Sequence, residues 1–507
     1  MPDRMKSSQK WSITLFTIGV FMAGLDNGII STALTTINEA FNVSASWGAW
    51  SITIYTLGIA ISVPIIGKLS DKYGRKRLFI IEIVLFGMGS LLVSISPTFP
   101  FLLLSRFIQA IGGGGIFIIG SSYILATLPK NKQGKALGML GGMHGLSAII
   151  GPNLGAVILN VTGNWHWMFL INIPIAIFLV IAGMIKIDES KPGSESALDY
   201  KGIALLSLAI LAMMYGITGM DGRSILSVIL FILIGLVLFG VLLIHERHLE
   251  QRGGDPIISS SLIRTRLFQV TLILGVLSGG FLAGIIFIPS YVQQVLQVPV
   301  ENAGYWLTPM AVASGIGAGL GGYMTDKKGP SKAVVLAGVI GLIGFGMFPV
   351  MVTGFWTFFA ASTMAGIGLG ILLGAPLNVL AGNSAQENEQ GSALGTLSLI
   401  RQIGLTLFPA LYAGFIASGI SKAEQTLQDT YGERVMVEIT GSNYNDLAEK
   451  LNQITDTGLQ HELFAVLSRI LQTGFDGLFL TAAVLSILVI AVGLFLAGQG
   501  DSVKKRS

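Results

Sequence analysis

Long apolar stretches recur along almost the whole chain, and short polar segments separate each stretch from the next. An α-helix rises about 1.5 Å per residue, so a run of roughly 20 apolar residues crosses the hydrocarbon core of a bilayer. By this criterion the sequence predicts an all-α integral membrane protein with fourteen transmembrane helices. These helices are expected to begin near Trp11, Trp47, Leu78, Pro100, Ala136, Trp167, Gly202, Ser224, Phe268, Ala303, Lys332, Gly354, Gly391 and Gly474.

One loop pattern occurs twice, after the second and after the tenth expected helix. The first copy reads Gly67-Lys-Leu-Ser-Asp71-Lys-Tyr-Gly74-Arg75-Lys76-Arg77, and the second reads Gly322-Tyr-Met-Thr-Asp326-Lys-Lys-Gly329. The duplication predicts a six-helix bundle in residues 1–187, a linker with two inserted transmembrane helices in residues 188–266, and a second six-helix bundle in residues 267–507. Two bundles related by a pseudo-twofold axis along the membrane normal are the architecture of an alternating-access carrier.

A polar segment of residues 421–473 separates the last two expected helices and is rich in Glu, Gln, Asn and Asp. Leu451, Ile454 and Leu459 recur within it at a spacing typical of a helix. Connections of this length usually have a role or are disordered. We expect an external helical hairpin here, or extensions of the two flanking helices.

Composition and charge support a membrane location. Apolar residues make up 52% of the 507 positions and charged residues only 11%, whereas roughly a quarter of the residues in soluble domains are charged. Lys and Arg gather in loops on one side, and the short opposite loops around Glu39, Pro97, Gly163, Gln297 and Thr353 contain none. This asymmetry predicts a multi-pass plasma-membrane protein with both termini cytoplasmic. It also explains the net charge of +4 without a nucleic-acid partner.

The sequence lacks the residue patterns that metal sites and nucleotide-binding sites require. The chain has no cysteine, and its five histidines do not show metal-ligand spacing. No nucleotide-binding glycine loop of the Walker type is found. We therefore expect no metal, no cofactor and no enzymatic activity. The first apolar stretch, from Trp11, is too long for the core of a signal peptide and is expected to remain as a helix.

Asp26 lies within the first expected helix, where a carboxylate near the bilayer centre costs roughly 2.5 to 3.5 kcal/mol. Counted along the helices, Asp26 and Arg106 lie roughly 12 Å and 9 Å below the same membrane face. The two side chains are therefore candidate neighbours, and a movement that separates them would change the proton affinity of the carboxylate. We interpret them as a proton-coupling pair; a static buried ion pair is the alternative.

The first copy of the repeated loop provides the most specific local signal. Gly67 and Gly74 permit a tight reversal, while Asp71, Arg75 and Arg77 can form ionic contacts that hold the cytoplasmic helix ends together. We expect these residues to form a cytoplasmic gate. The alternative is an orientation signal or a contact with anionic lipids.

Further candidates lie inside the expected helices. Gly151, Pro152 and Gly155 belong to a run of small residues in the fifth helix, which permits close helix contact and a kink; ordinary packing is the alternative. Glu82 is expected to pair with basic residues at the membrane interface. His144 is expected to be a packed or water-bonded core residue, with a proton carrier as the alternative. Arg401 and Gln402 either line a cavity or anchor the second bundle. Candidates for polar contacts in the cavity are Tyr55, Asn153, Asn172, Tyr291, Gln294 and Asn378.

With these residues, the chain resembles the fourteen-helix drug:proton antiporter branch of the major facilitator superfamily, essentially from end to end. The first helix carries Leu25-Asp26-Asn-Gly28 and Thr35, where Gly28 and Thr35 replace the usual Thr and Pro. The loop of residues 67–77 matches the superfamily's signature loop, and Arg106 and Gln109 fit the motif implicated in proton transfer. Gly151, Pro152 and Gly155 resemble the antiporter motif. Further matches are Trp165, Trp167, Asn172, Pro174, Pro289, Tyr291, Gln293, Gly304, Pro309, Arg401, Gln402 and Gly404.

The resemblance implies proton-driven export of amphipathic or lipophilic organic compounds by alternating access. The expected partners are a small amphipathic substrate, protons and membrane lipids, and we expect a monomer. Two alternatives stay open: an exporter of lipids or siderophores, and a membrane sensor or scaffold that binds a ligand without moving it.

Overall fold

The computed structural model describes residues 7–189, 199–218, 225–435, 444–454 and 456–504, and these residues form helices and connecting loops without a strand. The first half of the chain contains α1 (Ser7–Phe41), α2 (Ala45–Gly48), α3 (Trp50–Tyr73), α4 (Arg75–Ser94), α5 (Phe99–Gly114), α6 (Ile116–Thr127), α7 (Lys130–Thr162), α8 (His166–Leu170) and α9 (Asn172–Lys186). The inserted region contains α10 (Tyr200–Thr218), α11 (Ile225–Gln251) and α12 (Ser260–Arg264).

The second half repeats this plan with a longer final pair of helices. It contains α13 (Arg266–Ile286), α14 (Ile288–Gln294), α15 (Val300–Ala303), the 3-10 helix η1 (Gly304–Leu307), α16 (Thr308–Lys328), α17 (Pro330–Met351), α18 (Phe355–Gly374), α19 (Pro376–Ser384), α20 (Gln390–Val435), α21 (Tyr444–Asn452) and α22 (Thr457–Lys504). Both copies of the loop pattern turn on a glycine with positive φ, Gly74 (94°) before α4 and Gly329 (88°) before α17. Only glycine adopts that backbone without strain, which explains its place in both copies.

Twelve helical segments in the described residues are long and apolar enough to span a membrane, so the expected count of fourteen is not confirmed. The two remaining expected helices are present as α10 and α16. The apolar part of α10, Tyr200–Gly216, falls below the required length, and α16 is rich in glycine and packs between α7 and α18. Small residues lower its hydropathy because they serve contact between helices rather than contact with lipid.

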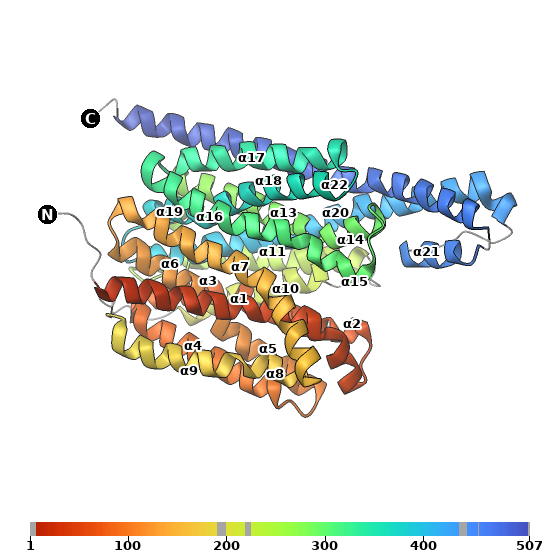
Figure 1. Cartoon of the computed structure of the whole chain (residues 1–507). Coiled ribbons are helices and arrows are strands. Elements are labelled where there is room, and N and C mark those ends of the chain that lie inside the picture. Colours follow the sequence, from red (N-terminus) through yellow and green to blue (C-terminus); the bar gives the residue numbers. More distant parts are fainter. Residues whose placement is uncertain (1–6, 190–198, 219–224, 436–443, 455, 505–507) are drawn as a thin grey trace.

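Large apolar side chains are exposed on the outer faces of the helices, including Ile185, Leu226, Val237 and Val350. A soluble protein rarely exposes so many, whereas a bilayer solvates them. Both described ends of the chain, at Ser7 and Lys504, lie on one side of the molecule, which we call the terminal end (Figure 1). The opposite side, where α21 lies beside the extended ends of α20 and α22, is called the hairpin end.

The hairpin end accounts for the polar segment of residues 421–473. There α20 continues to Val435 and α22 begins at Thr457, well before the expected start at Gly474. The apolar side chains of this segment form a small core of their own around Leu427, Leu451 and Leu467. Both expected forms are therefore present: extended helices that together make a hairpin, closed by the short helix α21. Residues 436–443 and 455 lie outside the described residues.

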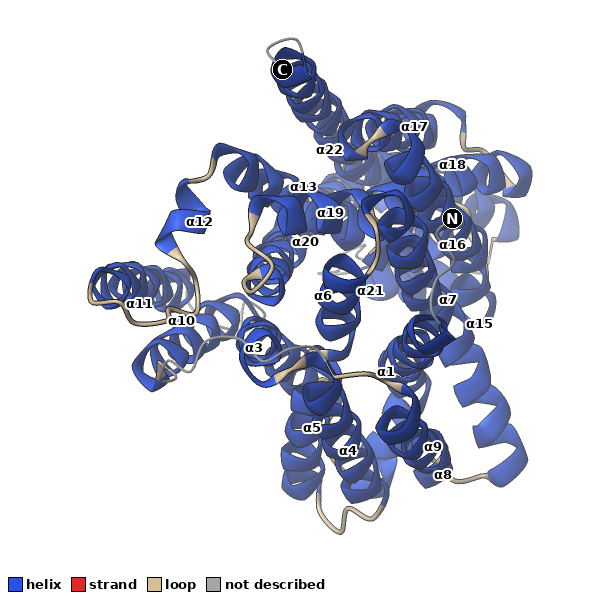
Figure 2. Cartoon of the chain, turned by 90° about the vertical axis from the view of Figure 1, so that its left-hand side faces the viewer, coloured by secondary structure: helices blue, strands red, loops and turns tan. Residues whose placement is uncertain are grey.

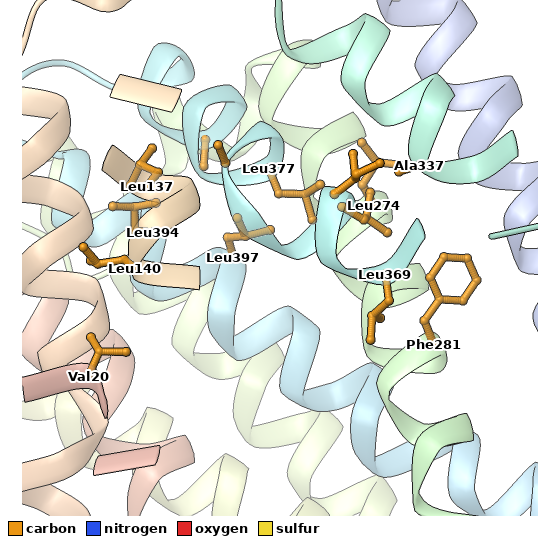
Figure 3. Packing of buried hydrophobic residues seen from close by; sticks show 14 of the residues in the cluster. Val20, Leu137, Leu140, Leu274, Phe281, Ala337, Leu369, Leu377, Leu394 and Leu397 are labelled. Carbon is orange, nitrogen blue, oxygen red and sulfur yellow. The ribbon is translucent and has the colours of Figure 1, made fainter. Parts of the chain in front are cut away.

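The two halves face each other, and α10 and α11 lie at the periphery beside α3 (Figure 2). One continuous cluster of buried apolar side chains joins both halves, from Val20 in α1 and Leu140 in α7 to Leu397 in α20 and Phe281 in α13 (Figure 3). The halves contact each other through α7 with α16 and through α3 with α20. These two contacts position the site described next.

Candidate functional site

A polar cluster is buried inside the first half, where α1, α4, α5 and α9 meet. Arg106 Nη1 in α5 donates to Asp26 Oδ2 in α1 and to Gln109 Oε1 (2.6 Å), and Gln109 Nε2 donates to Asp26 Oδ1 (2.8 Å) and to Ser90 Oγ in α4 (2.7 Å). All four side chains are buried from solvent. The structure thus brings Asp26 and Arg106 together, as their matched depths along the two helices predict.

Two more side chains complete this cluster. Asn172 Nδ2 donates to Asp26 Oδ1 (3.3 Å), and the Arg106 guanidinium lies over the ring of Tyr55, 4.0 Å from its centroid. Arg106 Nη2 and the Tyr55 hydroxyl are buried without a hydrogen-bond partner. Tyr55 is also part of the wall of the central cavity, so its side chain contacts both the buried ion pair and that cavity.

At the terminal end, the first loop copy joins the two halves through Asp71. Arg75 Nη2 donates to Asp71 Oδ1 (3.1 Å), and the backbone N–H of Ser392, in the first turn of α20, donates to Asp71 Oδ2 (2.9 Å). Arg75 Nε also donates to Ser122 Oγ (3.0 Å). A carboxylate is favourable at a helix N-terminus, where backbone N–H groups lack partners. We call the contact of Asp71 with the start of α20, together with the ion pair between Asp71 and Arg75, the latch.

The second loop copy makes the equivalent contact in the opposite direction, from the second half to the first. Asp326 accepts from the backbone N–H groups of Gly134 (2.6 Å) and Lys135 (2.8 Å) near the start of α7. Asp71 of the first half therefore binds a helix of the second half, and Asp326 of the second half binds a helix of the first. This exchange is what two bundles related by a pseudo-twofold axis would produce, and it was not evident from either copy alone.

Glycines bring the two halves into backbone contact at this end. A Cβ atom built on Gly67 would lie 2.3 Å from the carbonyl oxygen of Gly391, and one on Gly322 would lie 2.3 Å from that of Gly134. Real Cβ atoms do not approach other atoms so closely, so both positions require glycine in this arrangement. The molecule is accordingly closed at the terminal end.

We expect Asp71→Asn to weaken the latch. A charged carboxylate at a partly buried helix N-terminus stabilises by about 1 to 2 kcal/mol, so amide hydrogen exchange in residues 390–394 should speed up roughly 5- to 30-fold in the variant. The matched control is Asp326→Asn, which removes the same charge from a half-exposed site without an arginine partner and should have a smaller effect at the start of α7. Unchanged exchange in α20, or a larger effect of Asp326→Asn, would contradict this role of Asp71.

The central cavity, of about 680 Å³, lies between the two halves. Its wall is mostly apolar and glycine-rich and comes from α1, α3, α5, α6, α7, α13, η1, α16, α18 and α20. Gly304 and Tyr305 of η1, near the hairpin end, belong to the wall, whereas the terminal end is closed by the glycine contacts. The cavity has the volume and apolar lining of a site for a small organic ligand.

Two of the six expected cavity residues, Tyr55 and Asn153, line this cavity. The other four do not, which corrects the expectation. Asn172 belongs to the Asp26 cluster, and Tyr291 is enclosed by aromatic rings such as Phe479, 5.1 Å away. Asn378 donates to the carbonyl of Gly374 one turn back (3.0 Å), and Gln294 lies at the end of α14, away from the wall. Depth in the membrane does not fix the direction in which a side chain points.

The small-residue run of the fifth expected helix packs α7 on α1. A Cβ on Gly151 would lie 2.8 Å from Gly28 Cα, and Gly155 faces Thr32. Thr32 Oγ1 donates to the carbonyl of Pro152 (3.2 Å), and Pro152 itself lines the cavity. Close packing explains the glycines, and the proline belongs to the wall.

Two expectations about charged residues are corrected. Glu82 is fully buried and accepts from the backbone N–H of Gly115 (2.9 Å) at the break between α5 and α6, so it does not pair with basic residues at an interface. The Arg77 side chain is exposed, and only its backbone N–H is used, donating to the Glu189 carboxylate (3.2 Å). In the described residues, no group of three or more His, Asp or Glu side chains could hold a metal.

The sequence reasoning missed one set of contacts at the latch. Lys68 of the first loop copy forms an ion pair with Asp255, which follows α11, and Ser392 Oγ donates to the carbonyl of Ile257. The segment after the inserted helices thus touches α3 and the start of α20 together. The one signal in the sequence was the position of Lys68 in the repeated loop, and it did not identify Asp255 as the ion-pair partner.

Comparisons with known proteins agree with this architecture. A model of the Major Facilitator Superfamily matches residues 16–409. The chain is 57% identical over 96% of its length to the uncharacterized MFS-type transporter YfiU of Bacillus subtilis, of which 96% is covered. It is 32% identical over 79% of its length to Multidrug resistance protein 3 of the same organism, of which 78% is covered. The solved structure of the proton:xylose symporter XylE superposes with a TM-score of 0.57 at 16% identity, covering 96% of each chain.

Proposed function

Because the chain belongs to the Major Facilitator Superfamily, we propose that this transporter exports amphipathic or lipophilic organic compounds in exchange for protons. Relatives named as multidrug resistance proteins support the substrate class. The fourteen-helix drug:proton antiporter branch remains part of this proposal. So do a monomeric state, a plasma-membrane location with both termini cytoplasmic, and the absence of nucleic-acid and cofactor partners.

The observation that carries the proposal is the buried Asp26 and Arg106 pair, in contact with Tyr55 of the cavity wall. A buried ion pair is strongly sensitive to the loss of either charge, because the remaining charge is left without a partner. Protonation of Asp26 removes its charge and loosens its hold on Arg106. The binding of a proton is thereby linked to the packing of α1 against α5 and, through Tyr55, to the cavity wall.

The latch supplies the second conformational element. In the closed arrangement Asp71 binds α20 and Asp326 binds α7, and glycine contacts seal the terminal end. Under the proposed orientation this end faces the cytoplasm, so the structure corresponds to the state that releases substrate outward. Breaking both contacts would let the halves rock about the cavity and open it inward.

The energetics of exchange are favourable. One proton that enters through a potential of roughly 100 mV releases about 2.3 kcal/mol, before any pH gradient is counted. A tenfold gradient of an uncharged substrate costs about 1.4 kcal/mol at 25 °C. One proton per cycle is therefore enough to drive export of such a compound.

An exporter of lipids or siderophores is the second candidate, and the hairpin end favours it. The extended helices and α21 have their own apolar core and are tied to the loop after α14, since Gln297 Nε2 donates to the carbonyl of Phe464 (3.1 Å). A structured projection at the hairpin end, tied to the loop after α14, is suited to passing on a poorly soluble product.

Transport in sealed vesicles tests the proposal. The purified protein in liposomes with an imposed pH gradient should move lipophilic dyes against their gradient, and an uncoupler should abolish the movement. Movement of labelled lipid without movement of dye would favour the second candidate. A protein that binds dye yet produces no flux of dye or lipid would be a sensor or scaffold, which would overturn the proposal.

A further inference from the structure

Arg401 in α20 differs from Arg106, the arginine of the buried cluster, in having no ion-pair partner in the part of the chain that the structure describes. Arg106 donates to two side chains and is paired with Asp26. Arg401, in α20, has two nitrogen atoms, Nε and Nη2, that are buried and have no hydrogen-bond partner. These atoms carry three of the five N–H groups of a guanidinium. A buried cation with unmet donors is costly, so its presence requires a physical reason.

The position of Arg401 indicates that reason. Arg401 is part of the wall of the central cavity, together with Ser398, Gln402 and Leu405 of the same helix. Ser398, Gln402 and Leu405 lie three or four positions apart, and Arg401 lies next to Gln402 and three positions after Ser398. The four residues therefore share one face of α20, the face that looks into the cavity. The second half of the protein therefore presents a polar stripe with one positive charge to a cavity that is otherwise largely apolar.

Nothing of opposite charge balances Arg401 within this wall. Among the side chains that the structure describes, no Asp or Glu lines the cavity, and Asp26 is bound to Arg106 and Gln109. The other titratable nitrogen-bearing side chain in the wall is His144 of α7, whose ring centroid lies 6.2 Å from that of Phe117. His144 is exposed to the cavity, which corrects the expectation of a core residue. The net electrostatic character of the wall is therefore positive.

We propose that this cavity selects amphipathic organic anions, whose carboxylate, sulfonate or phosphate binds Arg401 while the apolar part fills the rest of the wall. The inference rests on the proposed transport function and names its substrate class. An anionic oxygen accepts the guanidinium N–H groups and neutralises the charge, whereas a cation of the same shape is repelled in a site of low dielectric constant. An inside-negative membrane potential favours outward movement of an anion, so the same potential drives both proton entry and substrate exit.

Two dyes with one ring system but opposite charge provide the direct test, because they separate charge from shape. Carboxyfluorescein and rhodamine 123 share the xanthene frame and carry negative and positive charge. The purified full chain in lipid nanodiscs should bind carboxyfluorescein, the anionic dye, at least tenfold more tightly than rhodamine 123, the cationic dye. Arg401→Gln should weaken binding of the anionic dye about 10- to 100-fold, as expected for the loss of charge-assisted hydrogen bonds, and leave the cationic dye unchanged or bound more tightly.

Matched variants distinguish recognition from a structural role. Arg401→Lys keeps the charge but not the fork of donors, and should retain part of the preference for anions. Arg469→Gln removes the same charge from an exposed position on the hairpin and should bind both dyes as the wild type does. Because Arg401 carries unmet donors, the melting temperature of Arg401→Gln should equal or exceed that of the wild type. Equal weakening of both dyes, a lower melting temperature with unchanged charge preference, or a wild-type preference for rhodamine 123 would overturn the inference.

Two further transport measurements in liposomes distinguish a soluble organic anion from an anionic lipid as the substrate. Movement of carboxyfluorescein identifies a soluble organic anion, and movement of labelled phosphatidylglycerol but not phosphatidylcholine identifies an anionic lipid headgroup; either result supports the inference. If the wild type binds anions selectively but moves neither dye nor lipid under a pH gradient, the transport proposal fails while the anion site stands. If it exports rhodamine 123 in preference, the transport proposal stands and the anion site fails.

Discussion

Replacing Asp26 by Asn is expected to abolish proton-driven transport while leaving a folded protein that still binds its substrate. Asn has nearly the shape of Asp, and its one acceptor oxygen can still accept from Arg106 or from Gln109, which now donate to separate oxygens of the carboxylate. Asn cannot take up or release a proton. Uptake of dye into inverted membrane vesicles on addition of a proton source should fall to the level of vesicles without the protein. Binding of the same dye to the purified variant should change less than threefold.

Loss of activity through poor folding must be separated from loss of coupling. Asp26→Asn leaves Arg106 buried without a negative partner, which can cost about 3 to 5 kcal/mol. The double variant Asp26→Asn with Arg106→Gln removes both charges and should recover the melting temperature of the wild type without recovering coupled uptake. The matched control is Glu82→Gln, a similar change at a buried carboxylate in the same half, which should keep coupled uptake. Undiminished uptake by Asp26→Asn would refute the role assigned to this residue.

Gly322→Val is expected to hold the transporter open at the terminal end and to stop transport. A Cβ at this position would lie 2.3 Å from the carbonyl oxygen of Gly134 across the boundary between the halves. Overpacking of this kind costs typically 1 to 3 kcal/mol, or about 5- to 150-fold in population. Because the clash exists only when the terminal end is closed, the open state gains that much. Coupled uptake should fall at least fivefold.

Gly319→Val is the matched control for this change. Gly319 lies on the same helix, α16, one turn earlier, and a Cβ there would meet nothing within 4 Å. Valine has a better helix propensity than glycine, so neither variant should fail to form the helix. The Gly319 variant should transport as the wild type does.

Accessibility of the cavity gives an independent measurement of the same effect. The chain has no cysteine, so Ser314→Cys, in the cavity wall, introduces a single reactive thiol. In the Gly322→Val background, a membrane-impermeant thiol reagent added at the terminal end should label this thiol at least fivefold faster than in the Gly319→Val background. Equal labelling in the two backgrounds would contradict a gate formed by Gly322 and Gly134.

Hydropathy and local backbone chemistry predicted the all-helical membrane fold and most of its helices. Apolar length located most of the helices because the bilayer sets a fixed span. The repeated loop predicted two similar halves, and both of its copies turn on a glycine at positive φ. Rise per residue placed Asp26 and Arg106 at similar depths, and the structure brings them into contact. The expected number of membrane spans was not confirmed. The small residues of α16, which packs between α7 and α18, lower its hydropathy below that of a typical span.

The direction of each side chain around its helix was decided by tertiary packing alone. Asn153 and Asn378 are both polar residues in apolar helices, yet only Asn153 lines the cavity, because a helix turns whichever face packs best toward its neighbours. The choice left open for Arg401, between the cavity wall and an anchor, was decided in favour of the wall in the same way.

The sequence by itself determined the membrane location, the duplicated plan and the chemistry available in each helix, since these follow from composition and local spacing. The tertiary structure alone decided which groups meet across the two halves: Asp71 with the start of α20, Asp326 with the start of α7, and Lys68 with Asp255. Such contacts join residues far apart in the chain, and their formation depends on how whole helices pack, which no local pattern contains.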